Sequence, residues 1–575
     1  MSYNREYERW LESDALTAEE KDELIAIKNS EDVKALRFSE PMSFGTAGLR
    51  STMYMGIGCM NRFTVAQATR GIAALVKKEN GENRGVAIAF DSRNNSAEFA
   101  RVSASILAYQ GIKVYIFDTL RPTPELSFAV RYFGAMAGIN ITASHNPKEY
   151  NGYKAYWEDG AQINPEQAKI VSTELSKFDV LDMSGADYYE KGVETGIITV
   201  LGEDFDEHYL DAVLATSINS ELVRDVADEL RVVYSPLHGA GYKLVPEVFR
   251  RMGLKYLYTV DSQMTPDGNF PTVKKPNPEY ADVFTDGIAI ADSVGSDLII
   301  ATDPDSDRVG VMARDKDGRF KTISGNQIGA LLLDYVISQK KALGKLSPDA
   351  FAVKSIVSTD MAYKIAEVHG IKLYDVYTGF KFIGEVIKSY EKIGKDGAFL
   401  LGFEESYGYL LGSYARDKDA VEASMMILEM TAYYRSRNMT LIDAVSALYD
   451  TYGYFAERTS EVYMEGLDGI ERRKRVMQQL RGSIPVSFGG VAVTEARDYK
   501  AGVTTYLASG KTAEIGLDPA DVLYYVLEND DKIIIRPSGT EPKIKMYFLA
   551  HANEPSALEA KIEAYAVDVK RITEV

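Results

Sequence analysis

The residues of this chain that could perform chemistry begin with a serine. Residues 138–141 form an apolar stretch that breaks into a polar turn carrying Ser144 and His145, and Lys154 follows. A free hydroxyl is a poor nucleophile and needs a base or a metal to activate it. The GxSxG elbow of hydrolases is absent from this segment, and a serine in such a turn most often only stabilises the turn. Ser144 becomes a candidate nucleophile if a metal site elsewhere could neutralise a phosphate on its oxygen.

Three carboxylates follow a second apolar stretch, residues 298–302, at alternating positions: Asp303, Asp305 and Asp307. In extended backbone these side chains would point the same way, about 7 Å apart. A turn at Pro304 would draw them together. Hard carboxylate oxygens suit Mg²⁺, which usually keeps positions open for a substrate phosphate or water. The spacing therefore predicts a site for one Mg²⁺ ion.

The acidic segment is open to three further interpretations, of which a solvated acidic turn is the plainest. An EF-hand requires glycine at loop position six and glutamate at position twelve, where this chain has Arg308 and Arg314. A phosphatase with Asp303 as nucleophile and Asp305 as acid would leave Ser144 without a role. A metal site is therefore favoured over all three.

Two loops of the chain could bind phosphate. In residues 44–50 the glycines let backbone N–H groups face inward, and Arg50 supplies a guanidinium fork. Residues 536–543 leave a strand and offer a guanidinium, two hydroxyls and a glycine N–H, although they could also form only a tight turn with an exposed arginine. A sugar also needs partners for its hydroxyls, and residues 402–406 supply carboxylates at a strand end. Together these segments favour an enzyme that moves phosphate.

Composition sets limits on the partners of the protein. The 575 residues are 46% hydrophobic and 26% charged, which is ordinary for a globular chain, here of about four domains. Acidic residues outnumber basic ones, 84 to 65, and the net charge of −19 repels nucleic acid and anionic membranes. An anionic substrate must therefore be held by local clusters of Arg and Lys.

Cysteine usage and the N-terminal residues favour the cytoplasm. Cys59 is the only cysteine, so no intramolecular disulfide can form. Residues 1–9 are charged and lack the apolar core of a signal peptide. No stretch reaches the ~18 apolar residues that span a bilayer. We expect a cytoplasmic protein, monomeric or weakly dimeric, with no nucleic-acid or membrane partner.

Short apolar strands alternate with longer amphipathic stretches over most of the chain. Strands, each followed by a polar loop, are predicted at 86–90, 113–117, 231–235, 297–302, 351–357 and 398–401. Helices are predicted after the capping box of Thr17 and Glu20, and after Asn164 with its first-turn proline. This alternation is typical of α/β units with largely parallel sheets. The similar layout of the units suggests an internal repeat, without a sharp period.

The last part of the chain has a different pattern. Strands at 522–527, 532–535 and 544–550, then a helix from about residue 556, indicate an α+β arrangement. We therefore predict an α/β protein with three similar α/β domains of mixed, largely parallel sheets and a C-terminal α+β domain. The predicted boundaries are 1–205, 206–323, 324–453 and 454–575.

The chemistry-bearing segments together closely resemble the α-D-phosphohexomutase family, whose members carry four loops, one per domain, around a central cleft. The segments that look like the phosphoserine, Mg²⁺, sugar and phosphate loops are 142–147, 303–308, 404–406 and 536–540. The resemblance spans nearly the whole length. In its sugar loop the chain is more similar to phosphoglucomutases than to the bacterial phosphomannomutase/phosphoglucomutases, in which a histidine stands where this chain has Gly408. The resemblance implies that Lys418 takes the role of that histidine, because its segment is similar to one in the glucose-specific members.

The resemblance implies that Ser144 rests as a phosphoserine whose phosphate completes the coordination of a metal ion. The implied metal ligands are Ser144, Asp303, Asp305 and Asp307. Arg308 would stabilise the moving phosphoryl group, and Arg50 and His145 would steady it near Ser144. Lys154 and Lys418 would manage protons at the hydroxyls, provided that burial lowers their pKa.

The resemblance also implies contacts with a phosphosugar substrate. The residues implied for the sugar are Thr378, Gly379, Glu404 and Ser406. Those implied for the non-reacting phosphate are Arg536, Ser538, Gly539, Thr540 and Lys545. The last domain, which carries the phosphate loop, would swing to close the cleft and exclude water.

The implied activity is interconversion of α-D-glucose 1-phosphate and glucose 6-phosphate. It would run through a phosphoserine and glucose 1,6-bisphosphate, the latter acting as intermediate and activator, with one Mg²⁺ per chain. Residues 274–279 are also similar to a longer phosphoglucomutase-2-like branch that includes phosphopentomutases, so ribose 1-phosphate stays a rival substrate. Phosphomannomutase activity and a catalytically idle protein that only binds phosphosugars also remain open.

Overall fold

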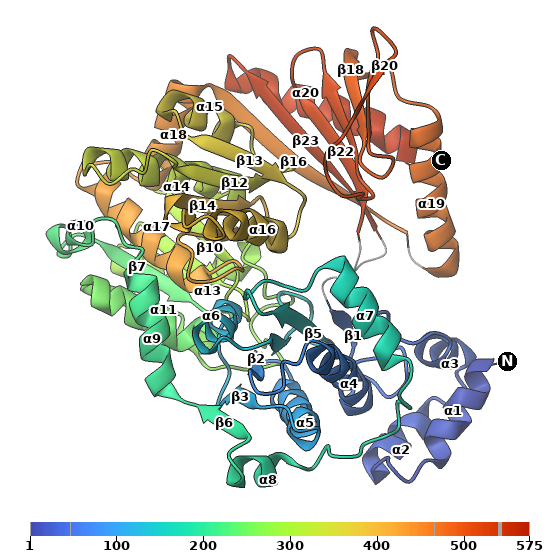
Figure 1. The fold of residues 1–575 in the computed structure, drawn as a ribbon. Coiled ribbons are helices and arrows are strands. Elements are labelled where there is room, and N and C mark those ends of the chain that lie inside the picture. Colours follow the sequence, from blue (N-terminus) through green and yellow to red (C-terminus); the bar gives the residue numbers. More distant parts are fainter. Residues whose placement is uncertain (1, 46–47, 465, 539–542, 574–575) are drawn as a thin grey trace. The chain divides into compact units, whose positions relative to one another are not determined.

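A computed structural model describes residues 2–45, 48–464, 466–538 and 543–573 of the chain (Figure 1). The chain divides into two compact units, each built from two segments. The first unit comprises residues 1–354 and 374–443, and the second comprises residues 355–373 and 444–575. Among the described residues, none of the helices combines the length and the apolar character that crossing a membrane requires.

The first sheet, of six strands in the order β1-β5-β4-β2-β3-β6, has apolar side chains on both faces. Along β2 (Val86–Phe90) the side chains alternate, as they must in a strand. Val86, Ile88 and Phe90 pack in one cluster with α5 (Ser96–Tyr109), whereas the two alanines between them pack with α6 (Thr123–Phe133). Helices therefore cover both faces, which is why the strand reads as a continuous apolar run.

The first unit contains three sheets that share one arrangement of four strands. The shared orders are β5-β4-β2-β3, β10-β9-β7-β8 and β15-β14-β12-β13. In each, a strand pairs in parallel with an earlier strand and in antiparallel with the strand that follows it. These middle strands are β4 (Ala137–Ile141), β9 (Leu298–Thr302) and β14 (Phe399–Glu404). The internal repeat suggested by the sequence is thus a repeated topology, and the predicted fold class is confirmed.

Of the remaining strands of the shared arrangement, three were predicted, at 113–117, 231–235 and 351–357, and five were not. In the first sheet they are β3 (Val114–Phe117) and β5 (Tyr150–Trp157); in the second β7 (Arg231–Ser235), β8 (Tyr256–Thr259) and β10 (Val309–Arg314); in the third β12 (Phe351–Ser355), β13 (Lys372–Val376) and β15 (Gly408–Leu410). The edge strands are β1 (Leu49–Thr52), β6 (Ile198–Leu201) and β11 (Phe320–Ile323). The predicted strand at 351–357 is two residues too long, because the chain turns after Ser355.

Helix starts follow the capping signals in the sequence. Thr17 and Glu20 form the predicted capping box of α2 (Ala18–Ala26). Asn164 caps α7 (Pro165–Leu175), with its side chain accepting from the backbone N–H of Gln167. Both helices therefore begin where the sequence predicts, because a capping side chain satisfies a backbone donor that the first turn leaves free.

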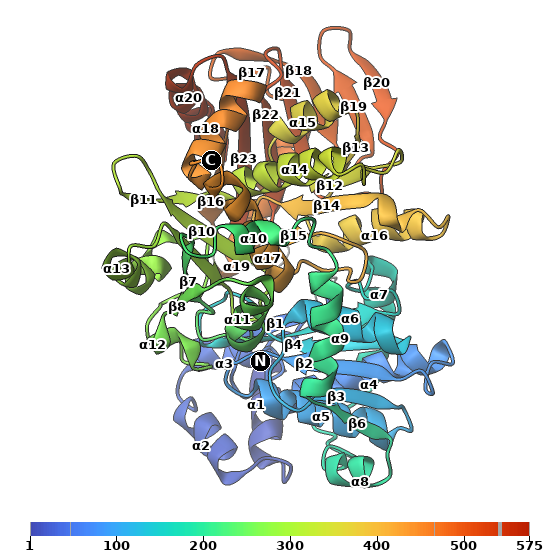
Figure 2. The ribbon, with the colours of Figure 1, turned by 90° about the vertical axis from the view of Figure 1, so that its left-hand side faces the viewer.

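The second unit is built on a largely antiparallel sheet in the order β16-β23-β22-β21-β18-β19-β20 (Figures 1 and 2). The predicted strands are β21 (Leu523–Leu527), β22 (Lys532–Pro537) and β23 (Lys543–Ala552), and the predicted helix is α20 (Pro555–Thr573). Helices α19 (Gly466–Gly482) and α20 pack on one apolar face of this sheet. Five further strands escaped prediction: β16 (Tyr454–Tyr463), β17 (Ser487–Phe488), β18 (Val491–Asp498), β19 (Val503–Tyr506) and β20 (Lys511–Glu514).

Candidate active site

The three candidate loops of the first unit occupy the same place in their sheets. Ser144 follows β4, the three aspartates follow β9, and Ser406 follows β14. Each loop joins the middle strand to its antiparallel neighbour, β5, β10 or β15. Loops at the carboxyl ends of parallel strands are where open α/β sheets bind ligands. The repeated topology therefore accounts for three chemically different loops at equivalent positions.

Each of these loops contains a non-glycine residue with left-handed backbone. The φ angles are 55° at Ser144, 51° at Ser306 and 66° at Tyr407. Such a conformation costs of order 1–3 kcal/mol and persists only where surrounding contacts hold it. At Ser144 the backbone N–H donates to Thr142 Oγ1 at 2.8 Å. Beside Ser306, the N–H groups of Asp307 and Arg308 both donate to Asp303 Oδ1 at 3.0 Å.

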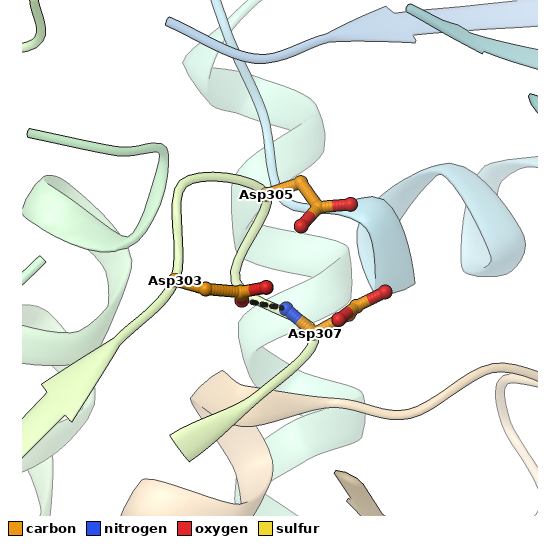
Figure 3. Close-up of side chains that lie close together, drawn as sticks. All are labelled: Asp303, Asp305 and Asp307. Carbon is orange, nitrogen blue, oxygen red and sulfur yellow. Dashed lines mark hydrogen bonds between the residues drawn. The ribbon is translucent and has the colours of Figure 1, made fainter. Parts of the chain in front are cut away.

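The side chains of Asp303, Asp305 and Asp307 project to the same side of their loop (Figure 3). Each offers a carboxylate oxygen, and these oxygens lie within 4.8 Å of one another. All three residues are buried. Burial, and then the charges of the two neighbouring aspartates, raises the pKa of Asp303 well above its usual range. Asp307 Oδ1 accepts no hydrogen bond from the residues that the structure describes.

Such a cluster fits a bound divalent cation. Three buried carboxylates repel one another, and a cation removes that repulsion. The donors are all hard oxygens, as Mg²⁺ or Ca²⁺ requires, and Asp307 Oδ1 supplies an acceptor to which none of the described residues donates. The turn at Pro304 draws together side chains that would stand about 7 Å apart in an extended strand. The structure therefore contains a group of residues that could hold a metal ion.

Ser144 lies directly beside this cluster. Its Oγ is 3.1 Å from Asp303 Oδ2 and 2.9 Å from Asp305 Oδ1, and the residue is 3% exposed. Residues that are far apart in the sequence thus meet because two loops of different sheets face each other. A group attached to the Ser144 oxygen would therefore lie next to a cation bound by the carboxylates.

Two buried lysines also contact the carboxylates. Lys154 Nζ lies 2.7 Å from Asp305 Oδ2 and 3.3 Å from Asp307 Oδ2. Lys418 Nζ lies 2.8 Å from Asp307 Oδ2 and 3.1 Å from Asp417 Oδ1. Burial alone would lower the pKa of each lysine, but the neighbouring aspartates outweigh it and raise both pKa values. The condition placed on a proton-transfer role for these lysines, that burial lowers their pKa, is therefore not met while the aspartates surround them without a cation.

Three further candidates surround Ser144. His145 is held neutral because burial, and then the charges of Arg308 and Arg50, lowers its pKa well below the usual range. Arg50 Nη1 donates to Asn146 Oδ1 at 3.0 Å, and Arg308 Nη1 lies 2.6 Å from Glu279 Oε1. Neighbouring side chains thus hold the two arginines, and both arginines lie close enough to His145 to lower its pKa.

The sugar-loop candidate Glu404 lies close enough to Lys418 and Arg308 to affect their charge. Glu404 is 7% exposed, and its Oε1 accepts from the Gly379 backbone N–H at 2.6 Å. The charge of Glu404 helps to raise the pKa values of both Lys418 and Arg308. Thr378 stands directly before Gly379, and Ser406 is partly buried in the loop after β14. The structure therefore brings Glu404 and Gly379 together in the unit that contains Ser144.

The predicted phosphate-loop residues belong to the second unit. Arg536 in β22 stands opposite Lys545 in β23, and the Ser538 N–H donates to Lys543 O at 2.8 Å. Lys545 Nζ lies 3.3 Å from Glu461 Oε1. The predictions for Gly539 and Thr540 lie outside the described residues. The described residues of the segment thus lie at the facing ends of two antiparallel strands, β22 and β23.

One group of residues that sequence reasoning missed holds the Ser144 loop. Arg93 is buried, and its guanidinium donates to four backbone carbonyls of the loop, those of Ser144, Asn146, Pro147 and Tyr150. Asp91 accepts from Thr142 Oγ1 at 2.6 Å and from the Arg93 N–H at 2.9 Å. The polar residues directly after the predicted strand at 86–90 were the available signal.

A second missed group contacts the metal-site candidates and Lys418. Thr123 Oγ1 donates to Asp305 Oδ2 at 2.8 Å. Asp417 Oδ1 accepts from the backbone N–H and from Nζ of Lys418, and its Oδ2 accepts from Tyr156 OH at 2.8 Å and Gln162 Nε2 at 3.2 Å. Thr123, Tyr156 and Gln162 lie far in the sequence from the aspartates that they contact, so no local sequence pattern could identify them.

Comparison with known proteins agrees with this arrangement. Family models for phosphoglucomutase/phosphomannomutase alpha/beta/alpha domains I, II and III match residues 41–179, 207–318 and 324–452. Phosphoglucomutases of Staphylococcus epidermidis and Staphylococcus saprophyticus are 35% and 36% identical to the chain, covering 91% and 93% of it and 93% and 95% of their own lengths.

A solved structure shares the fold. The open form of the phosphoprotein parafusin, a phosphoglucomutase from Paramecium, matches with a TM-score of 0.65 at 18% identity, covering 92% of this chain and 94% of its own. The three domain matches cover more than half of the chain, and the staphylococcal relatives cover nearly all of it. The resemblance deduced from the loops is therefore confirmed: the chain belongs to the phosphoglucomutase/phosphomannomutase family of α-D-phosphohexomutases.

Proposed function

We propose that the protein is a phosphoglucomutase that interconverts α-D-glucose 1-phosphate and glucose 6-phosphate, with Ser144 carrying the phosphoryl group between steps. The proposal rests on one observation above all. Ser144 Oγ lies within hydrogen-bond distance of two members of a buried three-carboxylate cluster, at 3.1 and 2.9 Å. Family membership and the phosphoglucomutase names of relatives 35% and 36% identical over nearly the whole chain support the same activity.

The three aspartates would hold one divalent ion, for which we propose Mg²⁺. All available donors are carboxylate oxygens, which is the set that Mg²⁺ prefers in phosphoryl-transfer sites. When bound, the ion would neutralise charge on phosphate oxygens next to Ser144. Thr123 and Lys154, which contact Asp305, would fix the orientation of that ligand.

The reaction would consist of two in-line phosphoryl transfers. In the first, the bond between phosphorus and Ser144 Oγ breaks, phosphorus bonds to O6 of glucose 1-phosphate, the O6 hydroxyl loses its proton, and Ser144 Oγ takes one. The product, glucose 1,6-bisphosphate, then turns over and returns its 1-phosphoryl group to Ser144 Oγ, which loses its proton. Glucose 6-phosphate leaves, O1 takes a proton, and the phosphoserine is restored. Such transfers depend on positioning and charge neutralisation more than on covalent chemistry.

The side chains around Ser144 would divide this work. We assign to Lys154 and Lys418 the proton transfers at the sugar hydroxyls. Their raised pKa values suit donation of a proton, and uptake of the O6 proton requires that a bound cation weaken their contacts with the aspartates. Arg308 would stabilise charge on the moving phosphoryl group. Neutral His145 and Arg50 would bind its oxygens near the serine. Glu404, oriented by the Gly379 N–H, would accept hydrogen bonds from sugar hydroxyls, together with Ser406 and Thr378.

The phosphate that does not react would be bound by the hairpin of the second unit. Arg536, Ser538 and Lys545 offer a guanidinium, a hydroxyl and an ammonium group on adjacent strands. Gly539 and Thr540 complete the same loop in sequence. A bidentate guanidinium is well suited to a phosphate dianion. The same loop would bind the 1-phosphate or the 6-phosphate, depending on the orientation of the sugar.

Steady-state kinetics test this function. The purified enzyme, with Mg²⁺ and catalytic glucose 1,6-bisphosphate, should convert glucose 1-phosphate to glucose 6-phosphate with a higher kcat/KM than mannose 1-phosphate or ribose 1-phosphate. A preference for ribose 1-phosphate or mannose 1-phosphate would assign the same machinery to a phosphopentomutase or a phosphomannomutase. No turnover of any of the three would contradict mutase activity.

A further inference from the structure

The backbone conformation of Gly408 does not itself require a glycine. It lies at the start of β15, and its φ is outside the left-handed region that favours glycine. A Cβ atom built on Gly408 would lie 2.3 Å from Lys418 Cδ and 3.2 Å from Lys418 Cγ. Real Cβ atoms do not approach other heavy atoms so closely. The methylene stem of Lys418 therefore fills the space in which a side chain at position 408 would lie.

Lys418 cannot move away from that space at low cost, because both ends of its side chain are held. Its Nζ lies 2.8 Å from Asp307 Oδ2 and 3.1 Å from Asp417 Oδ1. Its backbone N–H donates to the same Asp417 oxygen at 2.9 Å. The residue is 8% exposed, so protein atoms enclose most of the stem. A substituent at 408 would displace the amino group from Asp307 instead of bending a free chain end.

Asp417 is in turn held from the other side. Its Oδ2 accepts from Tyr156 OH at 2.8 Å and from Gln162 Nε2 at 3.2 Å, and the residue is 1% exposed. Tyr156 lies in β5, the strand that follows the Ser144 loop. Burial, and then the Asp417 charge, raises the pKa of Tyr156 well above its usual range, so its hydroxyl stays a donor. Asp417 thus ties Lys418 to the sheet that carries Ser144.

We propose that Gly408 and Asp417 are positioning residues for Lys418: the glycine provides the channel for the lysine stem, and the aspartate fixes its amino group beside Asp307. This inference deepens the proposed function, on which it rests, by naming what places the amino group. Neither residue needs to touch the sugar phosphate. Both should act on the reaction only when Lys418 is present.

The test is a double-mutant cycle with Lys418, because coupling identifies residues that act through another. Gly408→Ala should lower kcat by about 10²-fold with a smaller change in KM, the scale expected when a catalytic group is misplaced by about 1 Å. In a Lys418→Ala background, which removes the clashing atoms, adding Gly408→Ala should change kcat less than about twofold. Asp417→Asn should show the same pattern, and Asp417→Glu should recover part of the loss.

Thermal unfolding provides a readout that does not depend on activity. Gly408→Ala should lower the apparent Tm by several degrees through overpacking, and Lys418→Ala should relieve that loss. Gly402→Ala is the matched control: it lies in the neighbouring strand, and its Cβ would lie 2.5 Å from an Ile383 methyl carbon. Its destabilisation should be the same with or without Lys418.

The outcomes separate this inference from the proposed function. An inactive wild-type enzyme would contradict the function, but the coupling in Tm between positions 408 and 418 would still test the steric part. An active wild-type enzyme in which Gly408→Ala costs as much without Lys418 as with it would overturn the positioning role. Additive effects of Asp417→Asn and Lys418→Ala on kcat would overturn the role of Asp417.

Discussion

At the scale of single residues, the most demanding feature of the site is the conformation of Ser144. Its left-handed backbone, with φ of 55°, is unfavourable for a residue with a side chain, so neighbouring groups must hold it. Arg93 helps to hold this conformation, because its guanidinium donates to four backbone carbonyls around the loop. A planar group with five donors can donate to all four carbonyls at once, whereas an ammonium group has only three donors.

Arg93→Lys should therefore lower kcat by about 10²-fold, because the Ser144 hydroxyl is no longer held in place. The lost buried hydrogen bonds should also lower the free energy of unfolding by about 1–3 kcal/mol. Steady-state kinetics and denaturant unfolding measure the two effects. Arg84→Lys is the control, because Arg84 also donates to backbone carbonyls but is exposed on the surface. Equal kcat values for wild type and Arg93→Lys would contradict the positioning role.

The buried carboxylates predict a dependence on a divalent cation. Removal of metal with EDTA should abolish activity, and Mg²⁺ should restore it. Because a ligand that binds only the folded state stabilises it by about 2.7 kcal/mol at one hundred times its Kd, Mg²⁺ should also raise the apparent Tm. In Asp303→Asn that rise should be lost. Stabilisation of Asp303→Asn as large as that of wild type would show that the ion binds elsewhere.

At the scale of helices and strands, the sequence patterns identify those elements whose signals are local. Strand β2 has the predicted bounds because both faces are covered and every residue is apolar. Strands β18 to β20 escaped because their side chains are mostly exposed or only partly buried, so no apolar run marks them. Asp417 and Arg93 escaped for a related reason. The polar residues after β2 mark Arg93 only as part of a loop, and the contacts that give Arg93 and Asp417 their roles are with distant segments.

One helix start carries a pH-dependent contribution to stability. Asp419 caps α17 (Ala420–Arg435) by accepting from the N–H groups of Val421 and Glu422. Tyr209 and Tyr414 donate to the same carboxylate. Burial nevertheless raises the pKa of Asp419 to about 6, and the hydrogen bonds only limit that rise. The folded protein thus holds a proton on Asp419 at pH values where the unfolded chain has lost it.

The sign of the effect follows from linkage. Since the folded-state pKa lies above the unfolded value of about 3.9, the stabilisation is fully present below that value and is lost as pH rises through about 6. Relative to Asp419→Asn, which cannot titrate, the free energy of unfolding of wild type should fall by roughly 2 kcal/mol between about pH 4 and pH 7. Denaturant unfolding at a series of pH values measures this difference. A difference that does not change with pH would contradict the assignment.

At the scale of the whole molecule, the candidate groups divide between the two units. The nucleophile, the carboxylates and both lysines belong to the first unit, whereas Arg536, Ser538 and Lys545 belong to the second. The threefold repeat of strand order accounts for the loops of the first unit, and the second unit adds a loop of a different kind on an antiparallel hairpin. The C-terminal α+β domain could be told from the three α/β domains in the sequence because its strand pattern differs, although the domain boundaries stay predictions.

This division predicts separable kinetic effects. Arg536→Ala should raise KM by about tenfold or more, since a charge-assisted hydrogen bond contributes about 1.5–3 kcal/mol, and should change kcat less. The amount of phosphate on Ser144 should not change. Arg458→Ala, on a surface ion pair of the same unit, should leave both parameters as in wild type. An unchanged KM in Arg536→Ala would show that Arg536 does not bind the substrate phosphate.

The central claim is that one hydroxyl, that of Ser144, stores a phosphoryl group between two visits of the same sugar. Intact-mass measurement of the enzyme after incubation with glucose 1,6-bisphosphate and Mg²⁺ tests it most directly. The mass of one phosphoryl group should be added, peptide mapping should locate it on Ser144, and glucose 6-phosphate should remove it. Ser144→Ala should gain no mass and lose several orders of magnitude in kcat. Wild-type turnover by Ser144→Ala, or phosphate on another residue, would contradict the account.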